Sequence, residues 1–209
     1  MLQQVFLSIN LTQSDLATFF SGPAFLSWNR FGNIQGSWGN SSLPQSWIDH
    51  EFLLSKQIIS RMLDLGMTPV LPAFTGFVPE SISRVAPNAT IVRGSEWNKF
   101  GEQYSNVTFL EPFDPLFGEL QTKLLRIQRE VYGDTGDVYT LDQYNENVPF
   151  SGDPAYLKNI SRETMGSLRD ANPNAVWLMQ VRIPLFHASF SPMLILLPPP
   201  SVLGYIHFN

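Results

Sequence analysis

A glutamate that directly follows a predicted strand is the residue of this sequence best placed to do chemistry. Segment 138–144 is rich in β-forming residues, and Asn145 and Glu146 come at or just after its end. In an α/β barrel, catalytic groups project from the carboxyl ends of the strands. A glutamate there can protonate the leaving oxygen of a glycoside, and a neighbouring asparagine can hold a sugar hydroxyl. The same dipeptide also occurs in plain loops and helix entries, so the surrounding elements have to decide between these readings.

The elements around this dipeptide alternate between strands and helices. Strands are predicted at 24–28, 70–74, 138–144 and 175–180. Helices are predicted at 11–20, at 46–65, from the Asp114-Pro115 cap to Gly133, and from the Asp153-Pro154 cap to Asn172-Pro173. Such alternation implies parallel strands with right-handed crossovers. A doubly wound sheet and a (β/α) barrel both fit, but no glycine-rich phosphate loop follows a strand, which disfavours nucleotide binding.

Capping patterns mark the ends of two of these helices. Thr12 with Asp15, and Ser46 with Asp49, have the spacing of a capping box. Gly66 supplies a left-handed stop to helix 46–65. One face of that helix is apolar, as in an amphipathic helix, and carries Trp47, Leu54, Ile58, Met62 and Leu65.

Composition excludes several classes of function. The 209 residues include 13 Lys and Arg and 18 Asp and Glu, a net charge of −5 without a basic cluster. This argues against nucleic acid and against an anionic membrane surface as partners. The sequence has no cysteine, and its three histidines are scattered without metal-ligand spacing. We therefore expect neither a metal site nor a disulfide, and the oligomeric state stays open.

Four segments, in register along the chain, resemble glycoside hydrolase family 89, the α-N-acetylglucosaminidases. They are GPAFLSWNRFGN at 22–33, GMTPVLPAFTG at 66–76, DQYNEN at 142–147 and AVWLMQ at 175–180. The likeness runs from about Leu11 to Gln180. It implies an α/β fold in which residues 1–180 form part of a (β/α)8 TIM barrel, with about half the strands. Residues 181–209 are expected to be a divergent, poorly ordered tail.

The resemblance also implies an activity and a site. The activity is that of a retaining exo-glycosidase that removes terminal α-linked N-acetylglucosamine from an oligosaccharide or glycosaminoglycan such as heparan sulfate, without a cofactor. Glu146 matches the general acid/base, and Asn145 would lie beside it against the sugar. Trp28 and Trp97 match aromatic positions around the pocket, and Asn33 and Phe74 lie in its loops. A tryptophan in an apolar run such as 25–28 is equally compatible with a core position.

A second carboxylate is the feature that the sequence does not supply. Retention requires two carboxyl groups about 5–5.5 Å apart. The family's nucleophile lies beyond the motif that contains Glu146, and segment 181–209 has no Asp or Glu. Asp142 is four strand residues from Glu146, roughly 13 Å by Cα, and is expected to orient loops or to tune Glu146. Glu111 and Asp114 are expected to be loop and cap residues. The alternative to an enzyme is therefore an inactive truncated paralogue, or a gene-model fragment, with at most weak sugar binding.

Glycosylation motifs point to a secretory route. Asn-x-Ser/Thr sequons begin at Asn10, Asn40, Asn88, Asn106 and Asn159, more than chance predicts. The first residues lack the basic and long apolar regions of a signal peptide. We expect a lysosomal or secreted full-length family member whose true N-terminus precedes this sequence.

Overall fold

A four-stranded parallel sheet forms the frame of the molecule. The computed structural model describes residues 1–36, 43–144, 146–181 and 202–206 of the chain. The strands lie in the order β1-β4-β5-β6, and every neighbouring pair is parallel. Their bounds are β1 Leu71–Pro72, β4 Val138–Thr140, β5 Val176–Val181 and β6 Val202–Ile206. The three strands predicted at 70–74, 138–144 and 175–180 are confirmed. Of these, β1 and β4 are shorter than predicted.

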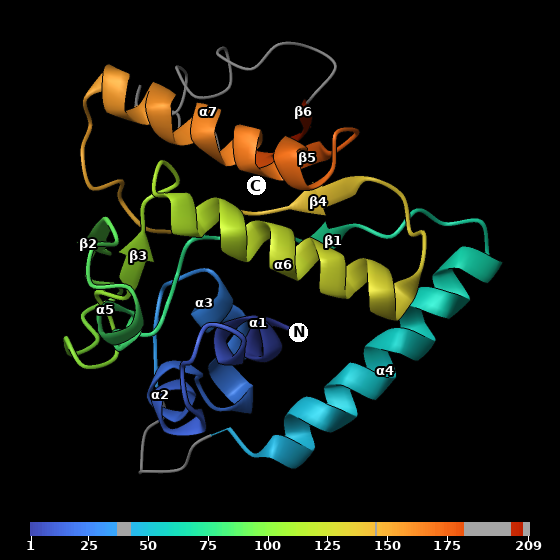
Figure 1. The fold of residues 1–209 in the computed structure, drawn as a ribbon, viewed down its shortest axis with the longest axis horizontal. Coiled ribbons are helices and arrows are strands. Elements are labelled where there is room, and N and C mark those ends of the chain that lie inside the picture. Colours follow the sequence, from blue (N-terminus) through green and yellow to red (C-terminus); the bar gives the residue numbers. More distant parts are fainter. Residues whose placement is uncertain (37–42, 145, 182–201, 207–209) are drawn as a thin grey trace.

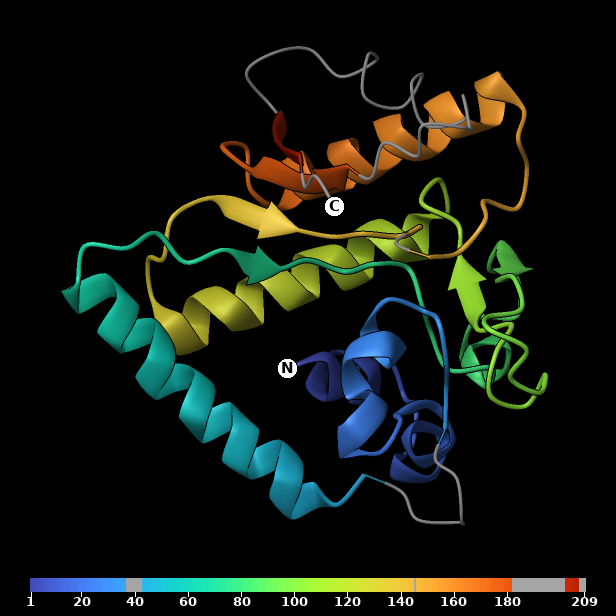
Figure 2. The same cartoon turned by 180° about the vertical axis from the view of Figure 1, so that it is seen from behind.

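The two crossover helices cover the same face of this sheet. Helix α6 (Pro115–Tyr132) precedes β4, and α7 (Pro154–Ala171) connects β4 to β5. Both lie in front of the strands in Figure 1 and behind them in the reverse view of Figure 2. A doubly wound sheet would carry helices on both faces. The one-sided cover is the arrangement of a barrel wall, which decides between the two expected architectures for the described strands.

Local capping chemistry fixes where the crossover helices begin. The Asp114 side chain accepts a hydrogen bond from Leu116 N, and the Asp153 side chain accepts one from Ala155 N, each at 2.9 Å. A proline follows each cap, where its fixed φ suits the first turn and its missing N–H costs nothing. Gly133 ends α6 at a φ of 75°. These boundaries confirm the sequence prediction.

Short helices, not a strand, occupy the N-terminal region. Helix α1 (Leu2–Leu7) was not predicted, and α2 (Gln13–Phe19) begins with the predicted capping box of Thr12 and Asp15. The strand predicted at 24–28 is wrong, because a 3-10 turn η1 (Pro23–Phe25) runs into helix α3 (Leu26–Arg30). Periodicity alone does not separate a short apolar run in a strand from one in a helix.

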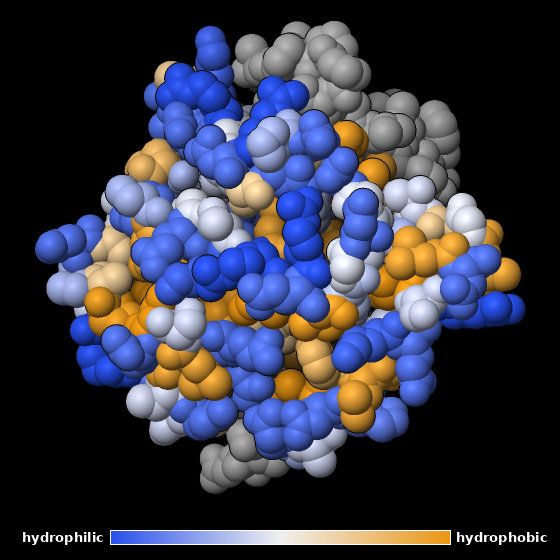
Figure 3. Space-filling model, turned by 45° about the vertical axis from the view of Figure 1, so that its right-hand side comes forward, coloured by the Kyte–Doolittle hydropathy of each residue, from blue (hydrophilic) through white to orange (hydrophobic). Residues whose placement is uncertain are grey.

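Helix α4 (Gln45–Asp64) is long and packs lightly on the rest of the chain. Its N-cap is Pro44, without a side-chain cap, so the predicted cap at Ser46 is wrong. Gly66 has the predicted positive φ, 72°. No residue of α4 is buried, and several large apolar side chains are exposed on or just after it. Apolar residues interrupt the hydrophilic surface on the face seen in Figure 3.

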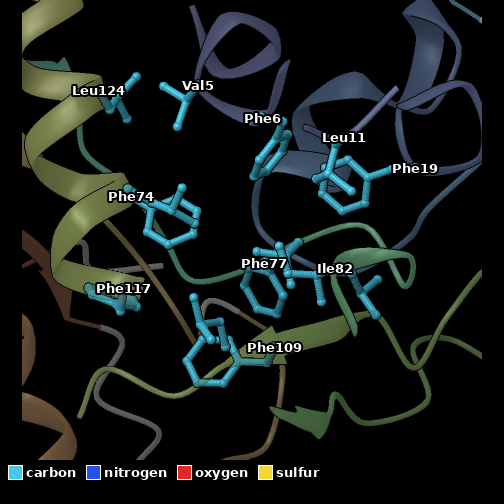
Figure 4. Packing of buried hydrophobic residues seen from close by; sticks show 14 of the residues in the cluster. Val5, Phe6, Leu11, Phe19, Phe74, Phe77, Ile82, Phe109, Phe117 and Leu124 are labelled. Atoms are coloured by element: carbon cyan, nitrogen blue, oxygen red, sulfur yellow. The ribbon is translucent and has the colours of Figure 1, made fainter. Parts of the chain in front are cut away.

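Two clusters of buried apolar residues hold these elements together. The larger joins α1 and α2 to α6 and to the antiparallel pair β2 (Ile91–Arg93) and β3 (Thr108–Leu110), with the short helix α5 (Ile82–Val85) beside it (Figure 4). The smaller lies between the sheet and helices α6 and α7, around Trp177. Among the helices of the described chain, none is long and apolar enough to cross a membrane.

The end of the described chain differs from the expected irregular tail. Strand β5 continues to Val181, one residue past the predicted boundary at Gln180. Strand β6 then pairs with β5 in parallel from Val202 to Ile206. The expectation of a tail without regular structure is therefore wrong for 202–206, because backbone pairing at a sheet edge does not need the alternating side-chain pattern on which strand prediction depends. Residues 182–201 and 207–209 lie outside the described part.

Candidate active site

Glu146 lies in the loop that leaves β4, at the carboxyl end of the parallel sheet. Its side chain is exposed, and its Oε2 accepts a hydrogen bond of 2.6 Å from the indole Nε1 of Trp97. The two residues come from different segments, the β4–α7 loop and the β2–β3 connection. A reachable carboxylate held by a fixed donor is the arrangement required of a group that exchanges protons with a ligand. Asn145, predicted to contact the sugar, lies outside the described residues.

An aromatic wall stands beside this carboxylate. The Trp97 ring stacks on Phe100, with centroids 5.4 Å apart and planes 15° apart. The centroid of the Trp28 ring lies 6.3 Å from that of Trp97, and the two planes are tilted by 43°. Trp97 is only 8% exposed, whereas Trp28 is 39% exposed. The structure thus places the two predicted tryptophans next to each other and Trp97 next to Glu146, and it leaves Trp28 as the open aromatic face.

Asn33 sits in the turn that follows Trp28 and α3. Gly32 makes this turn at a φ of 70°, and a Cβ added there would overlap the Phe77 ring. The Asn33 side chain is fully buried, and neither its Oδ1 nor its Nδ2 finds a hydrogen-bond partner among the described residues. Buried amide groups normally have partners, so this one is a candidate for a partner that the protein itself does not provide.

Phe74 occupies a different environment from the other predicted ligands. It is 1% exposed and packs on Phe117, with ring centroids 5.1 Å apart. Figure 4 shows it beside α6 within the larger apolar cluster. Its backbone N–H donates to Gln121 Oε1 at 2.7 Å. This packing makes Phe74 a core residue and does not support the prediction that its side chain contacts a sugar.

The loop that carries Glu146 is fastened on both sides of that residue. Before it, the Gln143 amide exchanges hydrogen bonds with the Thr164 hydroxyl of α7, at 3.1 and 3.3 Å. After it, Asn147 Nδ2 donates to the carbonyl of Phe31 at 3.0 Å. The Ser95 hydroxyl donates to Asn147 Oδ1 at 3.4 Å. A loop tied at this many points is preorganised, so its carboxylate does not have to be ordered when a ligand arrives.

Arg30 and Asp142 form a charged pair near the start of the same loop. The Arg30 guanidinium donates to the carbonyl of Thr140, the last residue of β4, at 3.4 Å. Burial lowers the pKa of Arg30, and the negative charge of Asp142 opposes this effect. Asp142 therefore sits across from a buried cation, which agrees with the expectation that it orients the loop.

A buried acid directly follows β3, a strand of the separate two-stranded sheet. Glu111 is 1% exposed, and its Oε1 accepts a 2.7 Å hydrogen bond from the Tyr156 hydroxyl. Burial raises the pKa of Glu111, and the Tyr156 hydrogen bond works against that rise. Burial, followed by the charge of Glu111, also raises the pKa of Tyr144. Glu111 lies in a loop, as expected, but it is buried and anchors the start of α7 through Tyr156.

Several of these residues have no recognisable local pattern in the sequence. Asn147, Ser95 and Tyr156 matter through contacts that span 45 to 116 positions of sequence, and no local pattern marks such contacts. Within the described residues, no group of three or more His, Asp or Glu is arranged to hold a metal ion.

Sequence comparison identifies relatives over most of the chain. A family model described as the α-N-acetylglucosaminidase TIM-barrel domain matches residues 1–190. Human α-N-acetylglucosaminidase is 38% identical over 178 residues, which cover 85% of this chain and 24% of the human protein. The matched region of the family model thus extends past the predicted limit at Gln180.

Comparison of folds finds solved structures of family 89 glycoside hydrolase from Clostridium perfringens. One, in complex with 2-acetamido-1,2-dideoxynojirimycin, superposes with a TM-score of 0.81 at 21% identity, covering 97% of this chain and 22% of the other. Another, with two glutamates changed to glutamine, is bound to its substrate GlcNAc-α-1,4-galactose, with a TM-score of 0.77 at 20% identity. At this identity the likeness concerns the fold, and the chain spans less than a quarter of the length of these relatives.

Proposed function

Because the chain belongs to the α-N-acetylglucosaminidase family, we propose that it binds a terminal α-linked N-acetylglucosamine residue and that Glu146 is the general acid/base for cleavage of its glycosidic bond. The observation that carries the proposal is the Trp97–Glu146 hydrogen bond beside the exposed ring of Trp28. It places a reachable carboxylate and an aromatic face together at the carboxyl end of a parallel sheet. Heparan sulfate chains that end in this sugar are the substrate class that the family resemblance predicts.

The chemistry assigned to Glu146 has two steps. The protonated carboxyl gives its proton to the glycosidic oxygen while the C1–O bond breaks and a second carboxylate attacks C1 from the opposite face. The Glu146 carboxylate then takes a proton from a water that attacks C1 and releases the second carboxylate. Trp97 donates its N–H to Oε2 and so holds the carboxyl group in place for both proton transfers.

Sugar recognition is assigned to the groups around this carboxylate. The exposed Trp28 ring offers an apolar face to one side of the pyranose. The unpartnered amide of Asn33 matches the hydrogen-bonding groups of a hydroxyl or an acetamido group. Asn145 is proposed as a second hydroxyl ligand on the grounds of its position beside Glu146.

The second carboxylate limits what the 209 residues do alone. Of two other acids that follow strands, Glu111 is buried against Tyr156, and Asp142 interacts electrostatically with Arg30. A nucleophile must be both ionised and reachable; burial disfavours both for Glu111, and the charge of Asp142 is engaged by Arg30. These two observations favour a second candidate function for this chain, sugar binding without turnover.

Hydrolysis of an activated aryl α-N-acetylglucosaminide, with and without azide, tests the proposal. Azide can replace a missing nucleophile by attacking C1 as the aryloxide leaves, which gives a β-configured glycosyl azide. We expect turnover that depends on azide. Glu146→Gln should reduce this azide-dependent turnover most for substrates whose aryloxide is a poor leaving group, because those need a proton from Glu146. Azide-independent turnover would show that a nucleophile is present, and absence of turnover together with absence of inhibitor binding would contradict the proposal.

We also propose that the protein is a glycoprotein of the lysosome or the secretory route. Two sequon asparagines, Asn10 and Asn88, have exposed side chains, whereas Asn106 and Asn159 are half-buried. Asn40 lies outside the described residues. Expression in a eukaryotic secretory host should give a mass shift, removable by a peptide N-glycosidase, that Asn10→Gln and Asn88→Gln reduce. A protein without glycan at either site would contradict this localisation.

A further inference from the structure

We propose that Asn147 is a positioning residue that holds the three loops of the site together and thereby maintains the hydrogen bond between Trp97 and Glu146. This role deepens the proposed function and rests on it for its biological meaning. The contacts themselves belong to the protein without ligand, so the role can be tested without turnover.

The side chain of Asn147 joins three segments that are far apart in the sequence. Its Nδ2 donates to the carbonyl of Phe31, in the turn that leads to Asn33. Its Oδ1 accepts from the hydroxyl of Ser95, two residues before Trp97. Its own backbone follows Glu146 directly. Glu146, Trp97 and Asn33 are therefore each within two residues of Asn147 or of one of its two side-chain partners.

The Ser95 hydroxyl strengthens this junction because it also serves the backbone of the β4–α7 loop. Val148 N donates to Ser95 Oγ at 3.2 Å while the same hydroxyl donates to Asn147 Oδ1. Ser95 thus binds the β4–α7 loop at two consecutive positions, through the side chain of Asn147 and the backbone of Val148. These two hydrogen bonds connect the β2–β3 connection, which contains Trp97, to the β4–α7 loop, which contains Glu146.

Burial explains why an asparagine is needed at this point. The Asn147 side chain is 6% exposed, so its hydrogen bonds are not readily replaced by water. Leucine has a similar volume but neither a donor nor an acceptor, and it would leave the Phe31 carbonyl and the Ser95 hydroxyl without this partner. Small relative movements of the two loops then lengthen the Trp97–Glu146 bond, and displacements of about 1 Å are enough to impair a site.

A matched control is available at the opposite end of the sheet. Asn172 is also buried, and its Nδ2 donates to Asp137 Oδ1 at 2.8 Å and to the Tyr139 hydroxyl at 3.0 Å. It lies after α7, where the chain enters the amino end of β5. Asn172→Leu therefore removes a comparable number of buried hydrogen bonds without touching the loops of the site.

The indole N–H resonance of Trp97, observed by ¹⁵N NMR of the full chain, reads the bond directly. Trp97→Phe identifies the signal among the five tryptophans. The donor senses its acceptor, so Glu146→Gln should shift the resonance from its wild-type position. We expect Asn147→Leu to shift it by a comparable amount and Asn172→Leu to leave it unchanged, with both variants folded.

The result that overturns the inference is a folded Asn147→Leu protein whose Trp97 resonance matches the wild type. An equal shift in Asn172→Leu would overturn it as well, because the effect would then be one of general stability. If Asn147→Leu does not fold, Asn147→Asp provides the same test, since it keeps the acceptor for Ser95 and loses the donor to Phe31. An Asp variant with an unchanged Trp97 resonance would overturn the inference.

Ligand binding separates this inference from the proposed function. The wild type should bind 2-acetamido-1,2-dideoxynojirimycin about tenfold more tightly than Asn147→Leu, the loss expected for roughly one hydrogen bond. A Trp97 resonance that depends on Asn147 in a protein that binds no inhibitor would contradict the proposed function alone. Inhibitor binding with a Trp97 resonance that ignores Asn147 would contradict the inference alone.

Discussion

Two glutamates that follow strands have opposite surroundings, and the difference assigns their roles. Glu146 is exposed and receives the Trp97 N–H. Glu111 is buried and receives the Tyr156 hydroxyl. The first can exchange a proton with a ligand, whereas the second is a structural acid whose burial disfavours its charged form. Residue type alone does not distinguish them, because each is a glutamate at the end of a strand.

Glu111 should make the stability of the protein depend on pH. Burial raises its pKa in the folded state above the ordinary value of 4.5. The folded state then binds its proton more tightly than the unfolded state, so the free energy of unfolding falls as pH rises from that value through the raised pKa. Glu111→Gln, which keeps an acceptor for Tyr156, should remove this decline. Urea unfolding at pH values from about 4 to about 8 measures it, and identical slopes for the two proteins would show that Glu111 is not desolvated.

Trp28 should matter for binding more than for folding. Its ring is partly exposed and covers less of the core than Trp97 does. We expect Trp28→Ala to weaken binding of 2-acetamido-1,2-dideoxynojirimycin by about tenfold or more, as for an aromatic anchor. The free energy of unfolding should change by about 1 kcal/mol or less. Trp97→Ala, the control, should lower both quantities. A Trp28 variant with normal affinity and reduced stability would make this tryptophan a packing residue.

At the scale of elements, the Asp-Pro caps of helices α6 and α7 have the same sequence pattern, but the two aspartates differ in burial. Asp153 is exposed and caps α7 only. Asp114 is buried, caps α6 and also accepts a 2.6 Å hydrogen bond from Thr90 N. Asp153→Ala should therefore cost about 1 kcal/mol, the usual value of a cap. Asp114→Ala should cost about 1 kcal/mol more, because the Thr90 N–H loses its hydrogen bond as well. Equal losses in chemical denaturation would contradict the assigned contact with Thr90.

The elements that the sequence predicts well are those with local signals. Helices α6 and α7 begin at an Asp-Pro pair, α2 has its capping box, and β5 is a run of strand-forming residues. Periodicity failed at 24–28, where a buried helix and a strand share the same short apolar pattern. The hairpin of β2 and β3 was missed, since its strands have three residues each.

The candidate site was only partly accessible from sequence. Glu146, Trp28 and Trp97 were proposed from family motifs, and the fold brings the three together. Asn147 and Glu111 depend on partners such as Phe31 and Tyr156, which only the folded chain brings near them. Their importance follows from burial and hydrogen bonding, neither of which has a local sequence pattern.

At the scale of the whole molecule, helix α4 is the least covered element. Leu53 is 60% exposed on it, and Trp47, Leu54, Ile58 and Leu63 are also exposed. The chain should therefore bind a hydrophobic dye such as ANS and scatter light at high concentration. Leu53→Glu should reduce both signals and leave the melting temperature nearly unchanged, because the side chain makes little core contact. A lower melting temperature with unchanged dye binding would show that this face is covered in solution.

The most direct test of the account is a calorimetric titration of 2-acetamido-1,2-dideoxynojirimycin into the wild type and into Glu146→Gln. The inhibitor carries a ring nitrogen that becomes positive on protonation and interacts with a nearby carboxylate. The account predicts that the wild type binds and that Glu146→Gln binds about tenfold or more weakly, the expected value of a charge-assisted hydrogen bond. Equal affinities, or no binding by a folded wild-type chain, would contradict the assignment of Glu146 to an N-acetylglucosamine site.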